Sequence, residues 1–531
     1  MTSEVHALGP IELVFIMLAV AIGLSYLARR LHIAEPILLL VGGFALSFVP
    51  DLPAIELEPD VVFLLFLPPI LFSAAYFTPI RDFKANARPI LLLAIGLVLF
   101  TTVAVGLALQ ALVPGIEPAV AFTLGAIVAP PDAVAATAVF RRLGVPHRIV
   151  TILEGESLIN DASSLIAYRA AILVVATGTF SVFGALSDFV IVGGGGIIVG
   201  AVAGLIVSRA LHKTGDPMLE IIVSLLAPIA SYLAAEELGL SGVLATVTAG
   251  LITGQRAARI LSPEARLQGR GVWQTVIWLI NVFVFMLMGL QLREILAALS
   301  DYPADELAWL AVAVSGVVIG TRILWVFPAT YLPRLLSARV RRRDPYPPVR
   351  AVFIVSWAGM RGVVSLAAAL ALAADFPDRE LILFLTFAVI VATLVGQGLT
   401  LPWLIRRLGI LATDGPDAEE GHARLAAVDA ARVRLEELAR EYPDHQPLID
   451  RLREGFDHDA SHVRSDADGT LDDGDREAAE QELLEHQAIR TAVIGAQRET
   501  VIRLRDDGVI NDVTLRRIER ELDLQAVHGD D

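Results

Sequence analysis

Long apolar runs alternate with short polar connections from Ile11 to about Ile405, and this alternation dominates the sequence. An α-helix needs about 20 mainly apolar residues to cross the hydrocarbon core of a bilayer. Thirteen runs come near that length, and each predicts a membrane-spanning helix. They cover roughly 11–28, 36–50, 60–78, 89–113, 118–140, 148–177, 187–210, 217–236, 241–255, 272–292, 307–333, 349–374 and 381–405. The predicted fold class is an all-α polytopic membrane protein.

The composition supports this class and adds a second region. With 55% apolar residues, 19% charged residues and a mean hydropathy of +0.64, the chain does not resemble a soluble globular protein. Residues 1–410 carry 27 basic and 27 acidic side chains, whereas residues 411–531 carry 15 and 31, so the second region holds the whole net charge of −16. We therefore predict a transmembrane domain over 1–410 and an acidic cytoplasmic region over 411–531.

The acidic region has its own pattern. Helical periodicity covers Leu425–Arg440 and Ala478–Arg505, and the acidic stretch Asp457–Asp475 between them predicts a disordered loop. The whole chain contains no cysteine, which excludes disulfides, thiolate zinc sites and cysteine nucleophiles.

Basic residues in the connections indicate how the chain crosses the membrane. If the N-terminus lies outside, the inner connections carry 22 basic residues and the outer ones carry only Arg293 and Arg379. Because positive charge favours the cytoplasmic side, the sequence predicts an odd number of helices, an outer N-terminus and a cytoplasmic C-terminus in the cell membrane. One inner connection contains Arg334, Arg339, Arg341, Arg342, Arg343 and Arg350.

Two of the thirteen segments contain helix-breaking residues. In the fifth, Pro130 and Pro131 remove two backbone donors, and Asp132 is placed to cap the half-helix that follows. In the twelfth, two glycines flank an arginine in Trp357–Gly362. Interrupted helices at matching places in two halves of a membrane protein point to an ion site near the midplane. Kinks with only a structural role are the alternative for each break taken alone.

The sixth segment contains Glu154–Asp161 (EGESLIND), which brings three carboxylates among apolar residues. On a helix, Glu156 and Asn160 are four residues apart, as are Ser157 and Asp161, so their side chains share one face. An Asp at the bilayer centre costs roughly 2.5–3.5 kcal/mol, so such carboxylates are expected only where they face protein or water. This face predicts a site for a small cation. The alternative is a cytosolic loop that closes a soluble core.

Three further charges fall within apolar segments. Arg169 lies near enough to a helix end for its side chain to reach the interface. Arg322 and Arg361 lie deeper, and each is expected to need an acidic partner.

Taken together, the motifs resemble the sodium/proton antiporters of the NhaP and NHE type. The resemblance covers about residues 10–410 and rests on five motifs in the family's order. They are Phe66–Leu71 (FLPPIL), Asp132, Glu154–Asp161, Gly359–Leu366 (GMRGVVSL) and Val395–Leu401 (VGQGLTL). It implies thirteen helices in two inverted repeats with broken crossing helices and a homodimer. It also implies elevator-like movement of a core (about 89–177 and 307–407) against a dimerisation scaffold (about 11–78 and 187–292).

The resemblance also implies roles for single residues. Asp161 would be the shared cation and proton site with Asn160 beside it, and the cation ligands would be Asp161, Ser157, Glu156 and a backbone carbonyl near Pro131. The buried arginines would neutralise two other carboxylates, Arg322 that of Glu156 and Arg361 that of Asp132. This chain has Pro131-Asp132-Ala133 where many relatives have Thr-Asp-Pro, so any role of the Thr side chain is absent.

We therefore predict a transporter rather than an enzyme, which exchanges Na⁺, or alternatively Li⁺ or K⁺, for H⁺. Exchange would be electroneutral, because one uncompensated carboxylate takes one cation or one proton. The expected partners are monovalent cations, protons, membrane lipid and a second copy of the chain, with no cofactor and no nucleic acid.

Two other function classes remain open. A cation channel could use the same acidic site without proton exchange. An intramembrane hydrolase would need a histidine near Ser157, but His32, His147 and His212 fall at predicted helix ends.

Overall fold

The structure is a computed structural model of the 531-residue chain. It describes residues 10–31, 35–49, 64–178, 182–410 and 416–467, together with the helical stretch 492–504 and a few single positions between 481 and 522. Within these residues every regular element is a helix, which confirms the all-α fold class. Contacts divide the chain into two compact units, Met1–Ala412 and Thr413–Asp531.

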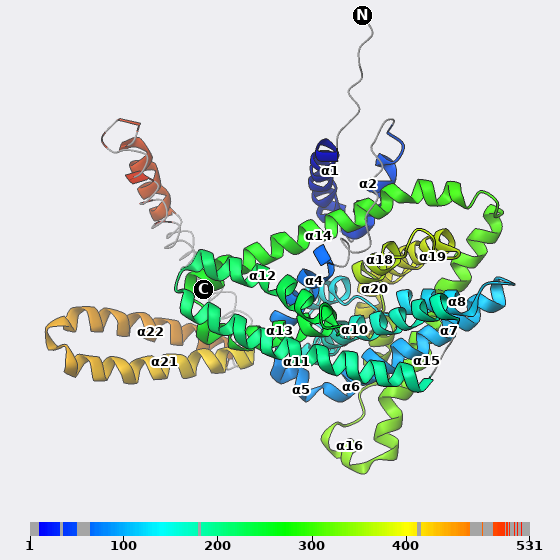
Figure 1. Ribbon diagram of the computed structural model, residues 1–531. Coiled ribbons are helices and arrows are strands. Elements are labelled where there is room, and N and C mark those ends of the chain that lie inside the picture. The colour runs from blue at the N-terminus through cyan, green and yellow to red at the C-terminus, as the bar shows by residue number, and fades with distance from the viewer. Residues whose placement is uncertain are drawn as a thin grey trace, which may run out of the picture. The chain divides into compact units, whose positions relative to one another are not determined.

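The first unit is a bundle of long helices (Figure 1), and two of its members are interrupted. Its elements are α1 (Pro10–Leu31), α2 (Glu35–Leu46), α4 (Leu67–Tyr76), α5 (Ile80–Ala85), α6 (Ala87–Leu91), η1 (Leu92–Leu97), α7 (Val98–Leu112), α8 (Pro118–Val128), α9 (Val134–Arg142), α10 (His147–Thr177), α11 (Val182–Thr214), α12 (Pro217–Glu236), α13 (Gly242–Ile260), α14 (Pro263–Ala298), α15 (Ala304–Leu336), α16 (Ala338–Arg343), α17 (Val349–Trp357), α18 (Val363–Leu370), α19 (Arg379–Val391), η2 (Ala392–Gln397) and α20 (Gly398–Leu408).

These helices match the predicted apolar segments closely. Eight helices in the described part of the chain are long and apolar enough to cross a membrane, if α6–η1–α7 and α19–η2–α20 each count as one. Three more, α2, α4 and α8, are apolar but shorter. Every predicted segment overlaps a helix, although residues 60–63 of the third lie outside the described residues. The count of thirteen crossings stays a prediction.

Small residues let some helices approach until their backbones touch. A Cβ added to Gly196 would lie 2.5 Å from the Ser241 carbonyl oxygen, and one added to Gly200 would lie 2.2 Å from that of Ala245. Helix α11 therefore packs against α13 through its glycines.

Like η2 between α19 and α20, η1 between α6 and α7 is a π-helical turn within a longer helix. Such a turn inserts one extra residue into an α-helix. At its start, the carbonyl of Leu92 accepts a hydrogen bond from Trp325 Nε1 of α15 (3.0 Å). The indole also fills the space beside Gly96, where an added Cβ would lie 2.5 Å from a Trp325 ring carbon.

The second unit contains a helical hairpin. Helices α21 (Pro416–Glu441) and α22 (Gln446–Ala467) are joined by the short helix η3 (Pro443–His445) and pack side by side (Figure 1). The predicted helix over 425–440 lies within α21. The predicted disordered loop is wrong for Asp457–Ala467, which continues α22, and Asp457 bonds to Arg432 of α21. The rest of that stretch lies outside the described residues.

Candidate functional site

The two broken helices are interrupted where the sequence predicts, and the interruptions cross each other. Residues 129–133 separate α8 from α9, and residues 358–362 separate α17 from α18. The Asp132 amide donates a hydrogen bond to the Met360 carbonyl (2.7 Å), which joins the two extended stretches. The approach is close enough that a Cβ on Gly362 would lie 1.9 Å from Asp132 Oδ2. Gly362 is therefore needed for the crossing to form.

Arg361 occupies the crossing and is fully buried. Its guanidinium donates to carbonyls at the C-terminal end of α8, through Nε to Val128 (2.9 Å) and through Nη2 to Ala129 (3.3 Å), and also to the Gly359 carbonyl. A helix C-terminus carries partial negative charge and free carbonyls, so it stabilises a cation there. The carboxylate of Asp132 lies next to Gly362, the residue that follows Arg361. Direct pairing of Asp132 with Arg361 stays a prediction.

Glu156 of α10 and Arg322 of α15 meet in the interior, with exposed side-chain fractions of 1% and 0%. Arg322 Nη1 donates to Glu156 Oε1 (2.5 Å) and Nη2 donates to Oε2 (2.9 Å). The same guanidinium also donates to the carbonyl of Val355 in α17 (3.1 Å from Nη2 and 3.3 Å from Nε). A two-pronged pair with a further acceptor offsets much of the cost of burying both charges.

Asn160 connects α10 to the first crossing stretch. It is fully buried, and its Nδ2 donates to the Pro131 carbonyl (2.9 Å). Its Oδ1 has no hydrogen-bond partner within the described part of the chain. One turn earlier, the Ser157 hydroxyl oxygen accepts a longer bond from the Ala133 amide (3.4 Å). The structure thus brings Ser157, Asn160 and the Pro131 carbonyl to one place.

Asp161 lies next to Asn160 on the same helix and is only 7% exposed. Glu156, Asp161 and Glu220 are the buried carboxylates among the described residues. Glu156 has its arginine, and Glu220 accepts bonds from the amide and hydroxyl of Ser262 (3.0 Å each). For Asp161, the described contacts include no ion pair and no side-chain hydrogen bond. A buried carboxylate in this state is costly unless a proton or a cation neutralises it.

The third carboxylate of the motif, Glu154, differs from the other two because it lies closer to the surface of the protein. It accepts a hydrogen bond from Arg141 of α9 (2.6 Å). Arg141 also lines a pocket of about 490 Å³ with Tyr76, Glu220 and Arg266.

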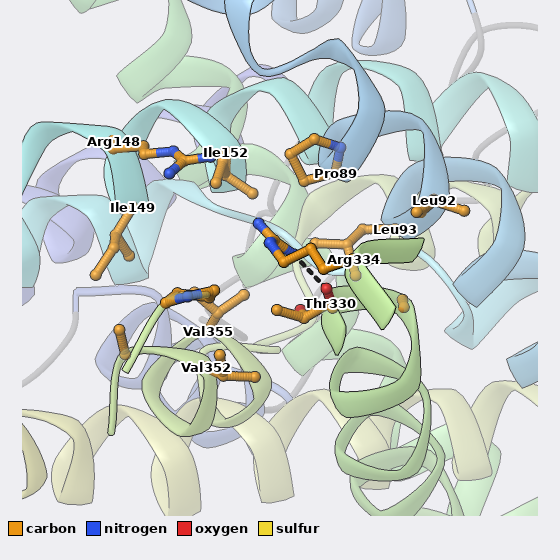
Figure 2. Close-up of a pocket in the computed structure, with 13 residues that line it drawn as sticks. Pro89, Leu92, Leu93, Arg148, Ile149, Ile152, Thr330, Arg334, Val352 and Val355 are labelled. Atoms are coloured by element: carbon orange, nitrogen blue, oxygen red, sulfur yellow. Dashed lines mark hydrogen bonds between the residues drawn. The ribbon is translucent and has the colours of Figure 1, made fainter. Parts of the chain in front are cut away.

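A second pocket, of about 90 Å³, lies between η1, α10, α15 and α17 (Figure 2). Val355, whose carbonyl holds Arg322, is part of its wall. Arg148 and Arg334 lie on its border, and Figure 2 shows Arg334 bonded to Thr330. Asp161 lines neither of the two pockets described.

Comparison of the sequence with known proteins identifies its family. The sequence model of the family described as "Sodium/hydrogen exchanger, transmembrane" matches residues 15–407. The chain belongs to the sodium/hydrogen exchanger family. An uncharacterized Na⁺/H⁺ exchanger of Mycobacterium tuberculosis is 33% identical over 98% of this chain and 96% of its own length. The low-affinity Na⁺/H⁺ antiporter NhaS1 of Synechocystis is 32% identical over 83% of each chain.

A solved structure shows the same fold. The sodium proton antiporter MjNhaP1 from Methanocaldococcus jannaschii, at pH 8, superimposes with a TM-score of 0.61 over 75% of this chain and 98% of that one, at 19% identity. The exchanger is therefore a multi-pass membrane transporter of the NhaP fold and not an enzyme. Members of this family need no cofactor besides the ions they carry, and the intramembrane hydrolase hypothesis is wrong.

The candidate site also contains residues that we did not predict. Thr393 of η2 is fully buried, and its hydroxyl oxygen accepts a hydrogen bond from the Arg361 amide (3.1 Å). The carbonyls of Val128, Ala129 and Val355 hold the two buried arginines. Backbone carbonyls carry no sequence signal, whereas Thr393 could have been noticed as a polar residue two positions before the motif Val395–Leu401.

Proposed function

We propose that the chain exchanges Na⁺ for H⁺ across the cell membrane, with Asp161 as the site that either ion occupies. The observation that carries the proposal is the contrast among the buried carboxylates. Glu156 has an arginine and Glu220 has two donors, while Asp161 has neither within the described residues. A proton or a desolvated cation can neutralise Asp161, but both cannot do so at once. Competition for one group is sufficient to couple two opposite fluxes.

The surrounding oxygens suit a small cation. A hard cation such as Na⁺ takes oxygen ligands from carboxylates, hydroxyls and carbonyls. Asp161, the Ser157 hydroxyl and the Pro131 carbonyl supply one of each, and Glu156 borders the set. The bond from Asn160 leaves the Pro131 carbonyl a second lone pair and fixes its direction. The unpartnered Oδ1 of Asn160 adds another oxygen to the same neighbourhood.

The charge balance supports electroneutral exchange. The pair of Glu156 and Arg322 is neutral, and Arg361 with Asp132 would be neutral as well. Asp161 then remains as the single variable charge, so one Na⁺ replaces one H⁺. The whole site has the same charge with either ion bound.

The arrangement of the site also suits an elevator. Every site residue lies on α8–α10, α15, α17–α18 or η2, or in the two breaks, and all of these fall within the predicted core over 89–177 and 307–407. The predicted scaffold, over 11–78 and 187–292, holds none of them. The core could therefore carry its ion across as one body, against the scaffold of a homodimer with an outer N-terminus and a cytoplasmic C-terminus.

The deciding experiment is an ion pulse on the purified protein in sealed liposomes that hold a pH dye. A Na⁺ gradient should drive proton movement in the opposite direction, and parallel pulses of Li⁺ and K⁺ give the ion preference. Clamping the membrane potential with a potassium ionophore should leave the rate unchanged if exchange is one to one. Sodium flux without any pH change would identify a channel and contradict the proposal.

A further inference from the structure

The connection between α15 and α17 carries an unusual concentration of positive charge. We call residues 332–350 the arginine connection. It contains six arginines and one aspartate, an excess of five positive charges. Four of its arginines lie on the short helix α16 and are exposed, and no acidic partner for them is found among the described residues: Arg339, Arg341, Arg342 and Arg343.

The same segment also exposes large apolar side chains. Leu335 and Leu336, just before α16, have exposed fractions of 68% and 77%, and Val349 just after it has 63%. Leu332 and Tyr346 are about half exposed. Arginines beside exposed leucines form an amphipathic surface of the kind that lies in a membrane interface, with the leucines toward the acyl chains and the arginines at the headgroups.

The base of the arginine connection is held in a fixed shape. Arg334 Nη2 bonds to Asp344 Oδ2 (2.6 Å), and Nε bonds to the Asp344 carbonyl (3.2 Å). The Tyr331 hydroxyl donates to the Pro347 carbonyl (3.2 Å), and its ring stacks on Tyr346. These contacts close a hairpin at the pocket in Figure 2, and Figure 1 shows α16 projecting at its tip.

Asp344 also fastens the hairpin to the rest of the unit. Its Oδ1 accepts from Arg148 of α10 (2.7 Å), and its Oδ2 accepts from Arg88 of α6. The only acid of the connection is therefore occupied at the base. It does not neutralise the arginines at the tip.

We propose that the arginine connection binds the phosphate headgroups of anionic phospholipids in the cytoplasmic leaflet. The argument is charge complementarity together with the exposed leucines, since a soluble anion would have no use for the apolar side chains. Guanidinium groups match phosphate oxygens in two-pronged hydrogen bonds. Basic residues close to an anionic leaflet each add to the attraction. The assignment of the leaflet rests on the proposed orientation of the chain, while the binding itself does not require transport.

The consequence is a link between lipid and transport. The connection continues directly into α17, which ends at the crossing, and into α15, which carries Arg322. Lipid bound at the tip would hold this side of the core at the level of the headgroups. Anionic lipid should therefore change the exchange rate as well as bind.

The test uses the full-length protein in nanodiscs of phosphatidylcholine with increasing fractions of a fluorescent phosphatidylglycerol. We expect saturable binding that weakens as salt rises. The quadruple variant Arg339→Gln, Arg341→Gln, Arg342→Gln, Arg343→Gln should bind about tenfold more weakly. A charge-matched control changes Arg29, Arg30, Arg256 and Arg259 to Gln, all exposed in other connections, and should lose less than threefold.

Two further measurements distinguish a lipid headgroup from a soluble phosphate, and the leucines of the surface from its arginines. Soluble glycerol phosphate at the same phosphate concentration should compete poorly, and the variant Leu335→Gln, Leu336→Gln should weaken lipid binding with all charges kept. Full competition by glycerol phosphate would overturn the lipid assignment in favour of a soluble anion. Equal losses of lipid affinity in the arginine variant and its control would contradict the assignment of the arginine connection as the binding site.

A crosslinking measurement keeps the proposal testable if the quadruple variant does not fold. A photoreactive p-benzoylphenylalanine at position 336 leaves every arginine in place. Phosphatidylglycerol adducts after irradiation are the expected product. Peptides from residues 413–531 as the main product would show that the acidic region occupies this surface instead, and would contradict the proposal.

Discussion

Helix α10 carries two buried carboxylates five residues apart, and their surroundings are opposite. Glu156 faces a guanidinium that holds both of its oxygens, while Asp161 has no ion pair among the described residues. The paired charge contributes to the architecture, because removing either partner leaves a costly buried ion. The unpaired charge is free to change its state. Burial alone therefore does not distinguish a structural carboxylate from a transporting one. The presence or absence of an ion-pair partner makes the distinction.

The largest effect is expected from Asp161→Asn. A neutral amide cannot exchange a proton, so Na⁺-driven pH change in liposomes should fall to the background of empty liposomes. The melting temperature in detergent should stay within a few degrees of wild type, because no described contact of the side chain is lost. Glu154→Gln, on the same helix, is the control and should keep most of the activity. Near wild-type exchange by Asp161→Asn would contradict the assignment of Asp161 as the site shared by Na⁺ and H⁺.

Arg322→Ala should act on stability. The loss of one member of a buried pair costs roughly 3–5 kcal/mol, since Glu156 would be left charged in the interior. Denaturant unfolding in detergent measures the free energy. The double variant Arg322→Ala, Glu156→Gln should recover part of the loss, and strictly additive effects would argue that the pair is not coupled.

Asn160→Ala should weaken cation binding at a modest cost in stability, because it removes a buried hydrogen bond. The change frees the Pro131 carbonyl from its hydrogen bond, a contact worth about 1–1.5 kcal/mol, or roughly tenfold in apparent Na⁺ affinity. The concentration dependence of Na⁺-driven exchange gives this affinity. Ser163→Ala is a matched control, because that hydroxyl bonds only to the Ile159 carbonyl of its own helix. An unchanged Na⁺ affinity would remove Asn160 from the site.

The contacts of Asp344 predict a stability that depends on pH, which can be compared with the stability contributed by the buried pair of Glu156 and Arg322. Burial alone would raise the pKa of its carboxyl, but hydrogen bonds and charges from Arg148 and Arg334 hold the pKa below its ordinary value. The stabilisation is therefore present above the unfolded pKa of about 3.9 and is lost as the pH falls through the lower folded pKa. Asp344→Asn should melt below wild type at pH 7, and the difference should shrink below about pH 4. Asp305→Asn, which is exposed, should show no such dependence.

The smallest effect is expected from removal of residues 415–531. The site residues all lie in the unit Met1–Ala412, so the truncated protein should fold and exchange. The acidic region with His445, His458, His462 and His486 could still modify the response to pH near neutrality. We expect a shifted activity–pH curve or a changed Na⁺ affinity. Curves that overlay those of the full chain would end this prediction.

Much of the fold could be predicted from the sequence because its signals are local. Apolar runs gave the helices, and Pro130 with Pro131 marked one break because proline acts on its own backbone. The paired glycines around Arg361 marked the other. The first part of the acidic loop, 457–467, was predicted wrongly, because a charged stretch still forms a helix when it packs against a neighbour such as α21.

The site was less accessible to sequence reasoning. Helical spacing placed Ser157, Asn160 and Asp161 on one face, and the need of Arg322 for an acid followed from its depth. The choice of Glu156 as that acid came from family resemblance, since the two positions are 166 residues apart. The carbonyls that hold Arg361 depend on how two distant breaks cross. No local pattern reports that geometry.

The π-helical turn η1 restricts the substitutions that this sequence can accept during evolution. The positions of Gly96 and Trp325 are interlocked there, because the indole bonds to the main-chain carbonyl of Leu92 and Gly96 leaves room for its ring. Losing the inserted residue would leave the indole without its acceptor, replacing Trp325 would leave the carbonyl without its donor, and enlarging Gly96 would collide with the ring. Any residue at position 92 supplies the same carbonyl, so Gly96, Trp325 and the length of the turn are expected to change together. An alignment of descendants should show them co-varying, with a one-residue gap wherever the tryptophan is missing.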